Sequence, residues 1–252
     1  MVLFRSCNLG GGSKIASLYI TIKYMIEYVT AGNTDDRILS RAASLLANGG
    51  LLALPLDTSW AVACSLRSKE GVKKLRRISG ERDERHFTLL CSNISQFGEL
   101  CDLDNTRFRL IKRLSPGPYV WLLKPLLGAE KTLGLRRREV GVRIPGHPLP
   151  LDLIAVLGCP LYTITAKRSM SADSPGEEED APADNGDHRS LDELPPIPEE
   201  DLFDGGWEIE GVAGIDMVLD TGEERPRIFS TILDVSGSEI RLIRAGAGVW
   251  PV

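Results

Sequence analysis

A polar turn near the middle of the first hundred residues has side chains that can bind a ligand. Residues 49–64 read GGLLALPLDTSWAVAC, so Asp57 and Thr58 lie between two short apolar segments. A carboxylate and a hydroxyl in one turn can hold a polar ligand, but they can also cap the turn by bonding to its own backbone. These residues alone leave both interpretations open.

Two further segments contain charged residues that could favour or oppose the binding of an anion. Residues 79–81 read SGE after an amphipathic segment, and residues 163–168 read TITAKR at the end of an apolar run. Lys167 and Arg168 place two cations directly after that run, where they are either ligand-facing or ordinary solvated charges. Glu81 adds a negative charge, which would repel phosphate oxygens.

Apolar patterning predicts alternating helices and strands around these segments. The three-to-four-residue periodicity and capping residues predict helices at 35–48, 68–78, 105–114 and 148–158, the first with Gly49 as its C-cap. Short apolar runs predict strands on both sides of the turn and at 87–91, 119–125, 139–145 and 160–165. Three short strands follow near the C-terminus, MVLD, STILDV and IRLIRAG, and the last two are close enough in sequence to pair antiparallel. The pattern predicts one α/β domain with a mixed sheet and helices packed on it.

The N-terminus and one internal segment do not follow this pattern. Residues 1–24 are interpreted as an extension that is either untranslated or disordered, because Lys14 and Lys23 interrupt its apolar run and organised patterning begins after Met25. Residues 171–204 contain 13 Asp and Glu against one Arg and lack apolar periodicity. They are predicted to form an acidic flexible insert within a domain spanning 25–252.

Cysteine and histidine usage argues against a metal centre and for a reducing compartment. The five cysteines include no C-x-x-C pair, and the three histidines lack metal-ligand spacing. We therefore expect a cytoplasmic protein with no metal site. No run reaches the roughly 18 apolar residues that a membrane span needs, so no membrane partner is expected.

The ordered segments PLDTSWAVAC, FTLLC, SPGPYVWLLKP, VGVRIPGHPLP, PLYTIT, STILDV and IRLIRAGAG resemble the YrdC/YciO family, and its YciO branch most closely. The resemblance covers about residues 25–170 and 205–252. It implies a YrdC-like open twisted mixed sheet whose concave face holds a nucleotide. It also implies synthesis of threonylcarbamoyl-AMP from threonine, bicarbonate and ATP, which releases pyrophosphate and serves tRNA modification. The ligands would then be ATP or AMP, with Mg as the counter-ion of ATP, and a threonine-like small molecule.

The resemblance also implies which residues bind nucleotide or substrate, although it assigns no catalytic residue. Pro55–Ser59 resembles the Pro-Thr-Asp-Thr turn of the family, with Leu56 departing from it, and Trp60 stands where the family usually has a Tyr that forms an aromatic wall. The implied binding residues are Asp57, Thr58, Arg143, Thr165, Lys167, Ser230, Thr231 and Arg244. Structural alternatives exist for some of them, because Ser230 and Thr231 suit local hydrogen bonds at a strand end and Arg143 suits an ion pair that supports the sheet.

Two motifs of the synthase branch are missing. Its Lys-x-Arg positions are occupied here by Ser79 and Glu81, and its Ser-x-Asn positions by Thr165 and Lys167. A lost hydrogen bond to a charged group is worth roughly 1.5 to 3 kcal/mol, so the phosphate site is expected to be degenerate. Lys167 and Arg168 are cations that could replace the lost pair. Arg82 and Arg85 lie close in sequence to the gap, but we interpret them as ordinary solvated charges in preference to replacements. If active, the chain would be an L-threonylcarbamoyladenylate synthase-like nucleotidyltransferase.

A second function competes with catalysis. Outside residues 171–204 the chain carries 29 basic and 22 acidic residues, including the basic runs RSKEGVKKLRR and LRRRE. Such a surface can bind phosphate backbones without reading bases, and members of the family are described as double-stranded RNA binders. The alternative is therefore a double-stranded RNA- or tRNA-binding module without catalysis. A weaker alternative is a regulatory scaffold whose acidic insert docks a partner.

Overall fold

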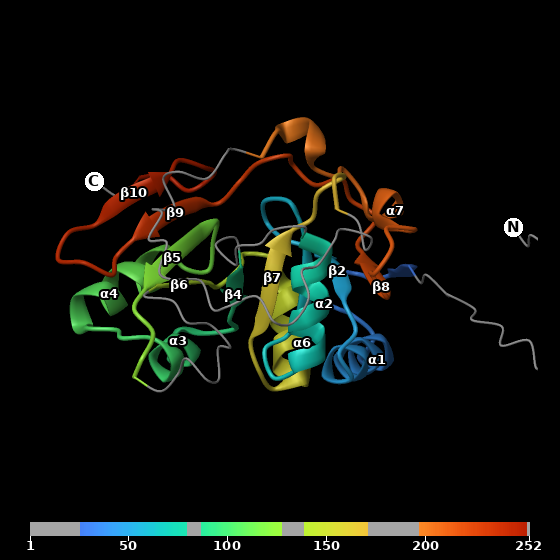
Figure 1. Ribbon diagram of the computed structural model, residues 1–252, viewed down its shortest axis with the longest axis horizontal. Helices are drawn as coiled ribbons and strands as arrows, with labels where there is room; N and C mark the ends of the chain where they lie inside the picture. The colour runs from blue at the N-terminus through green and yellow to red at the C-terminus, as the bar shows by residue number, and fades with distance from the viewer. Residues whose placement is uncertain (1–25, 80–86, 128–138, 171–196, 251–252) are drawn as a thin grey trace, which may run out of the picture.

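The computed structural model describes residues 26–79, 87–127, 139–170 and 197–250, and its strands form a single mixed sheet (Figure 1). In chain order the strands are β1 (Ile26–Tyr28), β2 (Leu52–Pro55), β3 (Trp60–Ser65), β4 (Thr88–Leu90), β5 (Tyr119–Leu123), β6 (Val140–Arg143), β7 (Leu161–Thr165), β8 (Met217–Asp220), β9 (Thr231–Asp234) and β10 (Arg241–Arg244). Across the sheet they run β1-β8-β2-β3-β7-β4-β6-β5-β9-β10. The predicted fold class is confirmed, and β9 and β10 pair antiparallel as expected.

Four of the helices form where the apolar pattern predicts them, and two further short helices were not predicted. The helices are α1 (Asp36–Ala47), α2 (Lys69–Ser79), α3 (Ile94–Leu100), α4 (Asn105–Leu114), α6 (Pro148–Leu157) and α7 (Gly206–Ile209), with a 3₁₀ turn η3 (Glu199–Asp201). One detail differs, because α1 ends with Asn48 as its C-cap. Gly49 is the following residue and adopts a φ of 84°, which a residue with a side chain rarely adopts.

The two faces of the sheet are covered by different helices. Buried side chains of α1 and α6, such as Leu46 and Leu153, form one apolar cluster with β2 and β3. Buried side chains of α2 and α3, such as Leu75 and Phe97, form a second cluster with the other sides of the same strands. Because each face is covered, the polar side chains of the central strands lie mainly at the strand ends.

The β2–β3 hairpin explains why the apolar sequence is broken by a polar turn. β2 pairs antiparallel with β3, and the backbone N–H of Leu56 donates to the carbonyl of Ser59 across the turn. β2 also pairs in parallel with β8, and β3 pairs with β7. The hairpin is therefore central in the sheet, and its turn is held between strands that come from distant parts of the chain.

The predicted acidic insert extends too far at its C-terminal end. Residues 197–204 pack against the sheet: Leu202 is fully buried, Phe203 is nearly so, and Leu202 forms a β-bridge with Lys167. The surrounding carboxylates mask these two apolar residues in a composition-based assignment. The rest of the predicted insert, residues 171–196, lies outside the described residues, as does the N-terminal extension.

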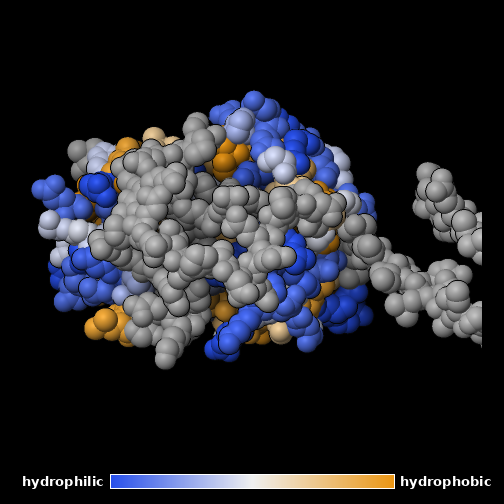
Figure 2. All heavy atoms as spheres, in the orientation of Figure 1, coloured by the Kyte–Doolittle hydropathy of each residue, from blue (hydrophilic) through white to orange (hydrophobic). Residues whose placement is uncertain are grey.

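The described part of the surface is mainly polar on the face shown in Figure 2, where hydrophobic residues appear as small separate patches. Among the described residues, no helix is both long enough and apolar enough to span a membrane.

Candidate functional site

Arg143 stands at the centre of the predicted site. It is the last residue of β6, and only 2% of its surface is exposed. Its Nη1 donates to Oγ of Ser230 at 2.6 Å and to Oγ1 of Thr58 at 3.2 Å, and its Nη2 bonds Oδ1 of Asp57 at 2.5 Å. Its Nε donates to the carbonyl of Gly117 at 3.3 Å. One guanidinium therefore joins β6 to three other segments of the chain.

Arg143 is a buried charge whose hydrogen bonds are made inside the protein. Burial lowers the pKa of its guanidinium below the ordinary value, although the neighbouring charge and hydrogen bond of Asp57 oppose the shift. The ion pair with Asp57 thus offsets part of the cost of burying the charge. Four of its five N–H groups are used inside the protein, so Arg143 mainly fixes Asp57, Thr58 and Ser230 in place.

The second oxygen of Asp57 lies against a glycine. A Cβ added at Gly146 would lie 3.1 Å from Oδ2 of Asp57, closer than such contacts normally are. Asp57 itself keeps 20% of its side chain exposed, whereas Thr58 is 1% exposed. The turn therefore presents its carboxylate to solvent and buries its hydroxyl on Arg143.

Arg244 approaches the same place from β10. Its Nε and Nη2 both donate to the backbone carbonyl of Ser230, at 3.2 and 3.1 Å, and its guanidinium carbon lies 4.9 Å from the centre of the Phe229 ring. Burial, and after it the charge of Arg143, lower the pKa of Arg244 to about 10. The hydrogen bonds that Arg244 makes with the described residues use Nε and Nη2 and not Nη1.

Thr231 holds the C-terminal loop onto β9. Its hydroxyl donates to the carbonyl of Gly248 at 2.6 Å and accepts from the backbone N–H of Gly246 at 3.0 Å. A Cβ at Gly246 would lie 2.4 Å from the carbonyl oxygen of Phe229, so only glycine fits there. Thr231 is 1% exposed, and its visible role is to position the segment that follows Arg244.

Thr165 and Lys167 lie at the end of β7, the strand that stands between β3 and β4 in the sheet. Thr165 pairs with Ala61 in the β3–β7 ladder and is half-buried, so it lies one residue from the start of β3. Lys167 is also half-buried, and its backbone bridges Leu202. The structure therefore joins Asp57, Thr58, Arg143, Ser230 and Arg244 by direct contacts and places Thr165 and Lys167 at the adjoining strand ends.

Two expectations are wrong. Arg168 was a candidate to replace a lost phosphate-binding cation, but its guanidinium pairs with Glu208 and lies 4.0 Å from Oδ2 of Asp204. Trp60 was expected to form an aromatic wall, but it is fully buried, and its indole N–H donates to the carbonyl of Asp204. Both side chains therefore make contacts inside the protein in place of the expected contacts with a ligand.

The position of the missing Lys-x-Arg motif is only partly described. Ser79 ends α2, is 8% exposed, and donates its hydroxyl to the carbonyl of Arg76 at 2.7 Å. Glu81, Arg82 and Arg85 lie outside the described residues. Ser79 brings no positive charge to the site.

The chemistry that this arrangement supports is anion binding. Two guanidinium groups meet at Ser230 against one carboxylate, Asp57, so the cluster carries an excess positive charge in a partly desolvated place. Among the described residues, no cluster of three or more His, Cys, Asp or Glu side chains could hold a metal ion.

Comparison with known proteins places this geometry in a family. The Sua5/YciO/YrdC family model, described as telomere recombination, matches residues 44–191, which is more than half of the chain. The chain belongs to the Sua5/YciO/YrdC family. The prediction from the order of the motifs is thereby confirmed.

Relatives within the Sua5/YciO/YrdC family include proteins of both branches. The chain is 30% identical over 137 residues to the YciO protein of Escherichia coli (strain K12), a match that covers 54% of this chain and 66% of the relative. It is 30% identical over 141 residues to the threonylcarbamoyl-AMP synthase of Mus musculus, covering 56% of this chain and 50% of that enzyme. The chain thus spans about two-thirds of the first relative and half of the second.

Solved structures of the Sua5/YciO/YrdC family share the fold. The crystal structure of E. coli YciO matches with a TM-score of 0.68 and 23% identity, covering 90% of this chain and 98% of that one. P. abyssi Sua5 complexed with L-threonine matches with a TM-score of 0.69 and 20% identity, covering 88% of this chain and 57% of that one. At these identities, the likeness shows that the sheet and its helices are alike.

Sequence reasoning missed two residues that lie at or near the site. Phe229, which stacks on Arg244, directly precedes Ser230, and an aromatic residue beside two hydroxyls could have been noticed. Asp204 was assigned to the flexible insert, although the apolar pair Leu202 and Phe203 before it signals a packed segment.

Proposed function

We propose that this protein binds ATP and a threonine-like amino acid and forms threonylcarbamoyl-AMP slowly, with a degenerate phosphate site. The observation that carries the proposal is the meeting of Arg143 and Arg244 at Ser230 beside the carboxylate of Asp57. This is an anion site in a protein whose family includes threonylcarbamoyl-AMP synthases. The product is proposed to feed tRNA modification.

Each residue has a distinct part in this proposal. Arg244 donates from Nη1 to a phosphate oxygen, and its lowered pKa of about 10 still leaves it charged at neutral pH. Arg143 holds the 55–59 turn and Ser230 in fixed positions relative to each other. Asp57, whose side chain is 20% exposed, is proposed to accept an N–H or O–H of the amino acid.

The reaction needs charge stabilisation more than covalent chemistry by the protein. Threonine and bicarbonate combine into a carbamate with loss of water. A carbamate oxygen then attacks the α-phosphorus of ATP, the bond to the bridging oxygen breaks, and pyrophosphate leaves. Negative charge builds up on the pyrophosphate, so rate depends on the cations around it. With Ser79 in place of a lysine, we expect slow turnover.

Lys167 is proposed to supply part of the missing charge, because it follows β7 at the strand end nearest the turn. The test is pyrophosphate release with ATP, Mg²⁺, bicarbonate and each common amino acid. We expect release that depends on threonine, and a loss of about tenfold or more in Lys167→Asn, since a charged hydrogen bond is worth roughly 1.5 to 3 kcal/mol.

Lys112→Gln is the matched control, because Lys112 is an exposed lysine of α4 that lies over Phe108. It should release pyrophosphate at the wild-type rate. If no amino acid supports release while ATP still binds, the synthase activity is refuted and nucleotide binding alone remains. Equal loss in both variants would mean that overall charge, and not the position of Lys167, matters.

A further inference from the structure

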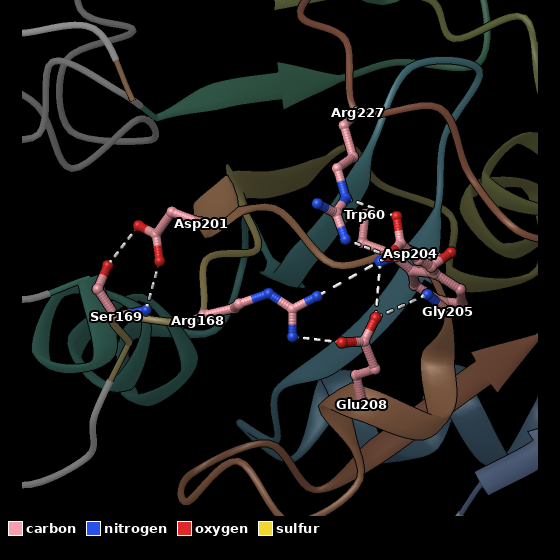
Figure 3. A network of polar contacts seen from close by, with 8 residues as sticks. All are labelled: Trp60, Arg168, Ser169, Asp201, Asp204, Gly205, Glu208 and Arg227. Carbon is pink, nitrogen blue, oxygen red and sulfur yellow. Dashed lines mark hydrogen bonds and ion pairs between the residues drawn. The ribbon is translucent and has the colours of Figure 1, made fainter. Parts of the chain in front are cut away.

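A second polar network lies beside the candidate site, and four of its charged side chains are joined by ion pairs (Figure 3). Arg168 follows β7, Asp204 and Glu208 belong to the segment around α7, and Arg227 lies between β8 and β9. Two cations face two carboxylates, so the network is balanced in charge and has no excess with which to bind an anion.

Asp204 is the residue that the others share. Its Oδ1 accepts from Nε of Arg227 at 2.6 Å, its Oδ2 pairs with Nη2 of the same guanidinium, and Arg168 lies 4.0 Å from Oδ2. Its backbone carbonyl accepts from the indole N–H of Trp60 at 3.3 Å and from the backbone N–H of Arg225 at 2.8 Å. The side chain and the main chain of one residue therefore contact three distant parts of the sequence.

Glu208 fixes the orientation of Asp204. Its Oε1 accepts from the backbone N–H of Asp204 at 2.8 Å and of Gly205 at 3.4 Å, and its Oε2 pairs with Arg168. The hydrogen bond from Arg227 holds the pKa of Asp204 below its ordinary value, so this carboxylate is ionised throughout the neutral range.

Three residues that Asp204 contacts are each close in sequence to a different residue of the candidate site. Arg227 is three residues before Ser230, to which Arg143 and Arg244 both bond. Trp60 directly follows the 55–59 turn that carries Asp57. Arg168 directly follows Lys167, and its backbone N–H donates to the carbonyl of Asp201 at 2.8 Å.

We propose that Asp204 is a positioning residue for the anion site: through Arg227, Trp60 and Arg168 it sets the relative placement of the three segments that carry Ser230, Asp57 and Lys167. The inference rests on the proposed nucleotide binding and adds a residue to it. Asp204 itself does not touch the nucleotide, so its loss alters the spacing of the site without removing a ligand contact.

The test is a calorimetric titration of ATP into the wild-type protein and Asp204→Asn, with thermal melts of both proteins. Asparagine keeps the size of the side chain but loses the charge that holds Arg227. We expect ATP to bind about threefold to tenfold more weakly to Asp204→Asn, the range of a partly exposed ion pair that is coupled to other bonds. Arg227→Gln should weaken binding by a similar factor, and the double variant should be no weaker than either single one.

Arg41→Gln is the matched control. It breaks an ion pair of similar exposure between α1 and Glu27 of β1, outside the network. It should lower the melting temperature by an amount comparable to Asp204→Asn while leaving the affinity for ATP unchanged.

A spectroscopic signal separates positioning from simple stability. The indole N–H resonance of Trp60, assigned by its absence in Trp60→Phe, should shift when ATP is added to the wild-type protein. In Asp204→Asn this shift should be smaller at saturating ATP. If Asp204→Asn melts earlier but binds ATP with wild-type affinity and shows the full shift, Asp204 is only structural and the proposal is overturned. If the wild-type protein binds no ATP at millimolar concentration, the proposed function fails, and this inference fails with it.

Discussion

Arg143 and Arg244 show how two arginines of one site can differ in role. Arg143 is 2% exposed and donates four N–H groups to protein oxygens, whereas the hydrogen bonds of Arg244 to the described residues use only Nε and Nη2, and its guanidinium lies over Phe229. Burial sets this difference. A guanidinium buried without internal partners would cost several kcal/mol, so the deeper one must bond within the protein.

His147 gives the site a pH dependence that can be measured as stability. Its side chain is 6% exposed and its Nδ1 accepts from the backbone N–H of Leu149 at the start of α6. Burial, and after it the charge of Arg225, lower the pKa of His147, against the opposing charges of Asp57 and Glu223. The folded protein therefore holds the neutral imidazole at neutral pH.

We expect unfolding free energy to fall as pH drops below about 6.5, the ordinary pKa that His147 regains on unfolding. Below that pH the unfolded state binds a proton at His147 that the folded state does not bind. The unfolding free energy therefore changes with pH by at most about 1.4 kcal/mol per pH unit. Urea unfolding between pH 5 and 8 measures this for the wild-type protein and for His147→Asn, which keeps a capping acceptor. Parallel curves for the two proteins would show that His147 contributes nothing to the slope.

At the level of single residues, the sequence predicts which residues lie near one another at the site better than it predicts what each residue does there. The motifs placed Thr58, Arg143, Ser230 and Arg244 near one another, and their direct bonds bear this out. The motifs did not reveal that Thr58 and Ser230 would be buried, because burial depends on contacts between segments distant in sequence. For the same reason, Arg168 looked available as a cation although Glu208 pairs with it.

Helices and strands were predictable where a local pattern specifies them. The residues of α4 and β2–β3 carry clear periodicity, turn residues and caps, and these elements form where expected. The seven-residue α3 was also not predicted, and the three-residue β1 and the four-residue α7 lack such a pattern and were not predicted. β1 and α7 are stabilised by pairing with β8 and by packing near Trp60, which local sequence cannot show.

The segment that includes η3 should contribute to stability. Leu202 is fully buried and bridges Lys167, so truncating it removes apolar contacts and leaves a cavity. We expect Leu202→Ala to lower the unfolding free energy by about 2 to 5 kcal/mol. Denaturant unfolding measures it.

Leu127→Ala is the matched control, since Leu127 is 101% exposed and its truncation should change stability by less than about 0.5 kcal/mol. A loss below about 1 kcal/mol in Leu202→Ala would show that residues 197–204 detach without consequence, as the original assignment to a flexible insert implied.

At the scale of the molecule, the candidate site and the polar network beside it differ in net charge. The Arg143 and Arg244 cluster has an excess of positive charge, whereas the neighbouring network of Asp204, Glu208, Arg168 and Arg227 is balanced. Binding of double-stranded RNA to the basic surface stays a prediction. The family relationship and the arrangement of buried arginines give the small-molecule function the stronger support.

The central claim is that Arg244 and its neighbours form a nucleotide site, and one titration tests it most directly. ATP is titrated calorimetrically into the wild-type protein, Arg244→Gln and Arg241→Gln. Arg241 is on the same strand but pairs with Asp234, so its variant removes the same charge elsewhere. We predict weak binding by the wild-type protein and by Arg241→Gln, and a loss of about tenfold or more in Arg244→Gln. Equal binding by all three proteins, or none by the wild-type protein at millimolar ATP, would contradict the account.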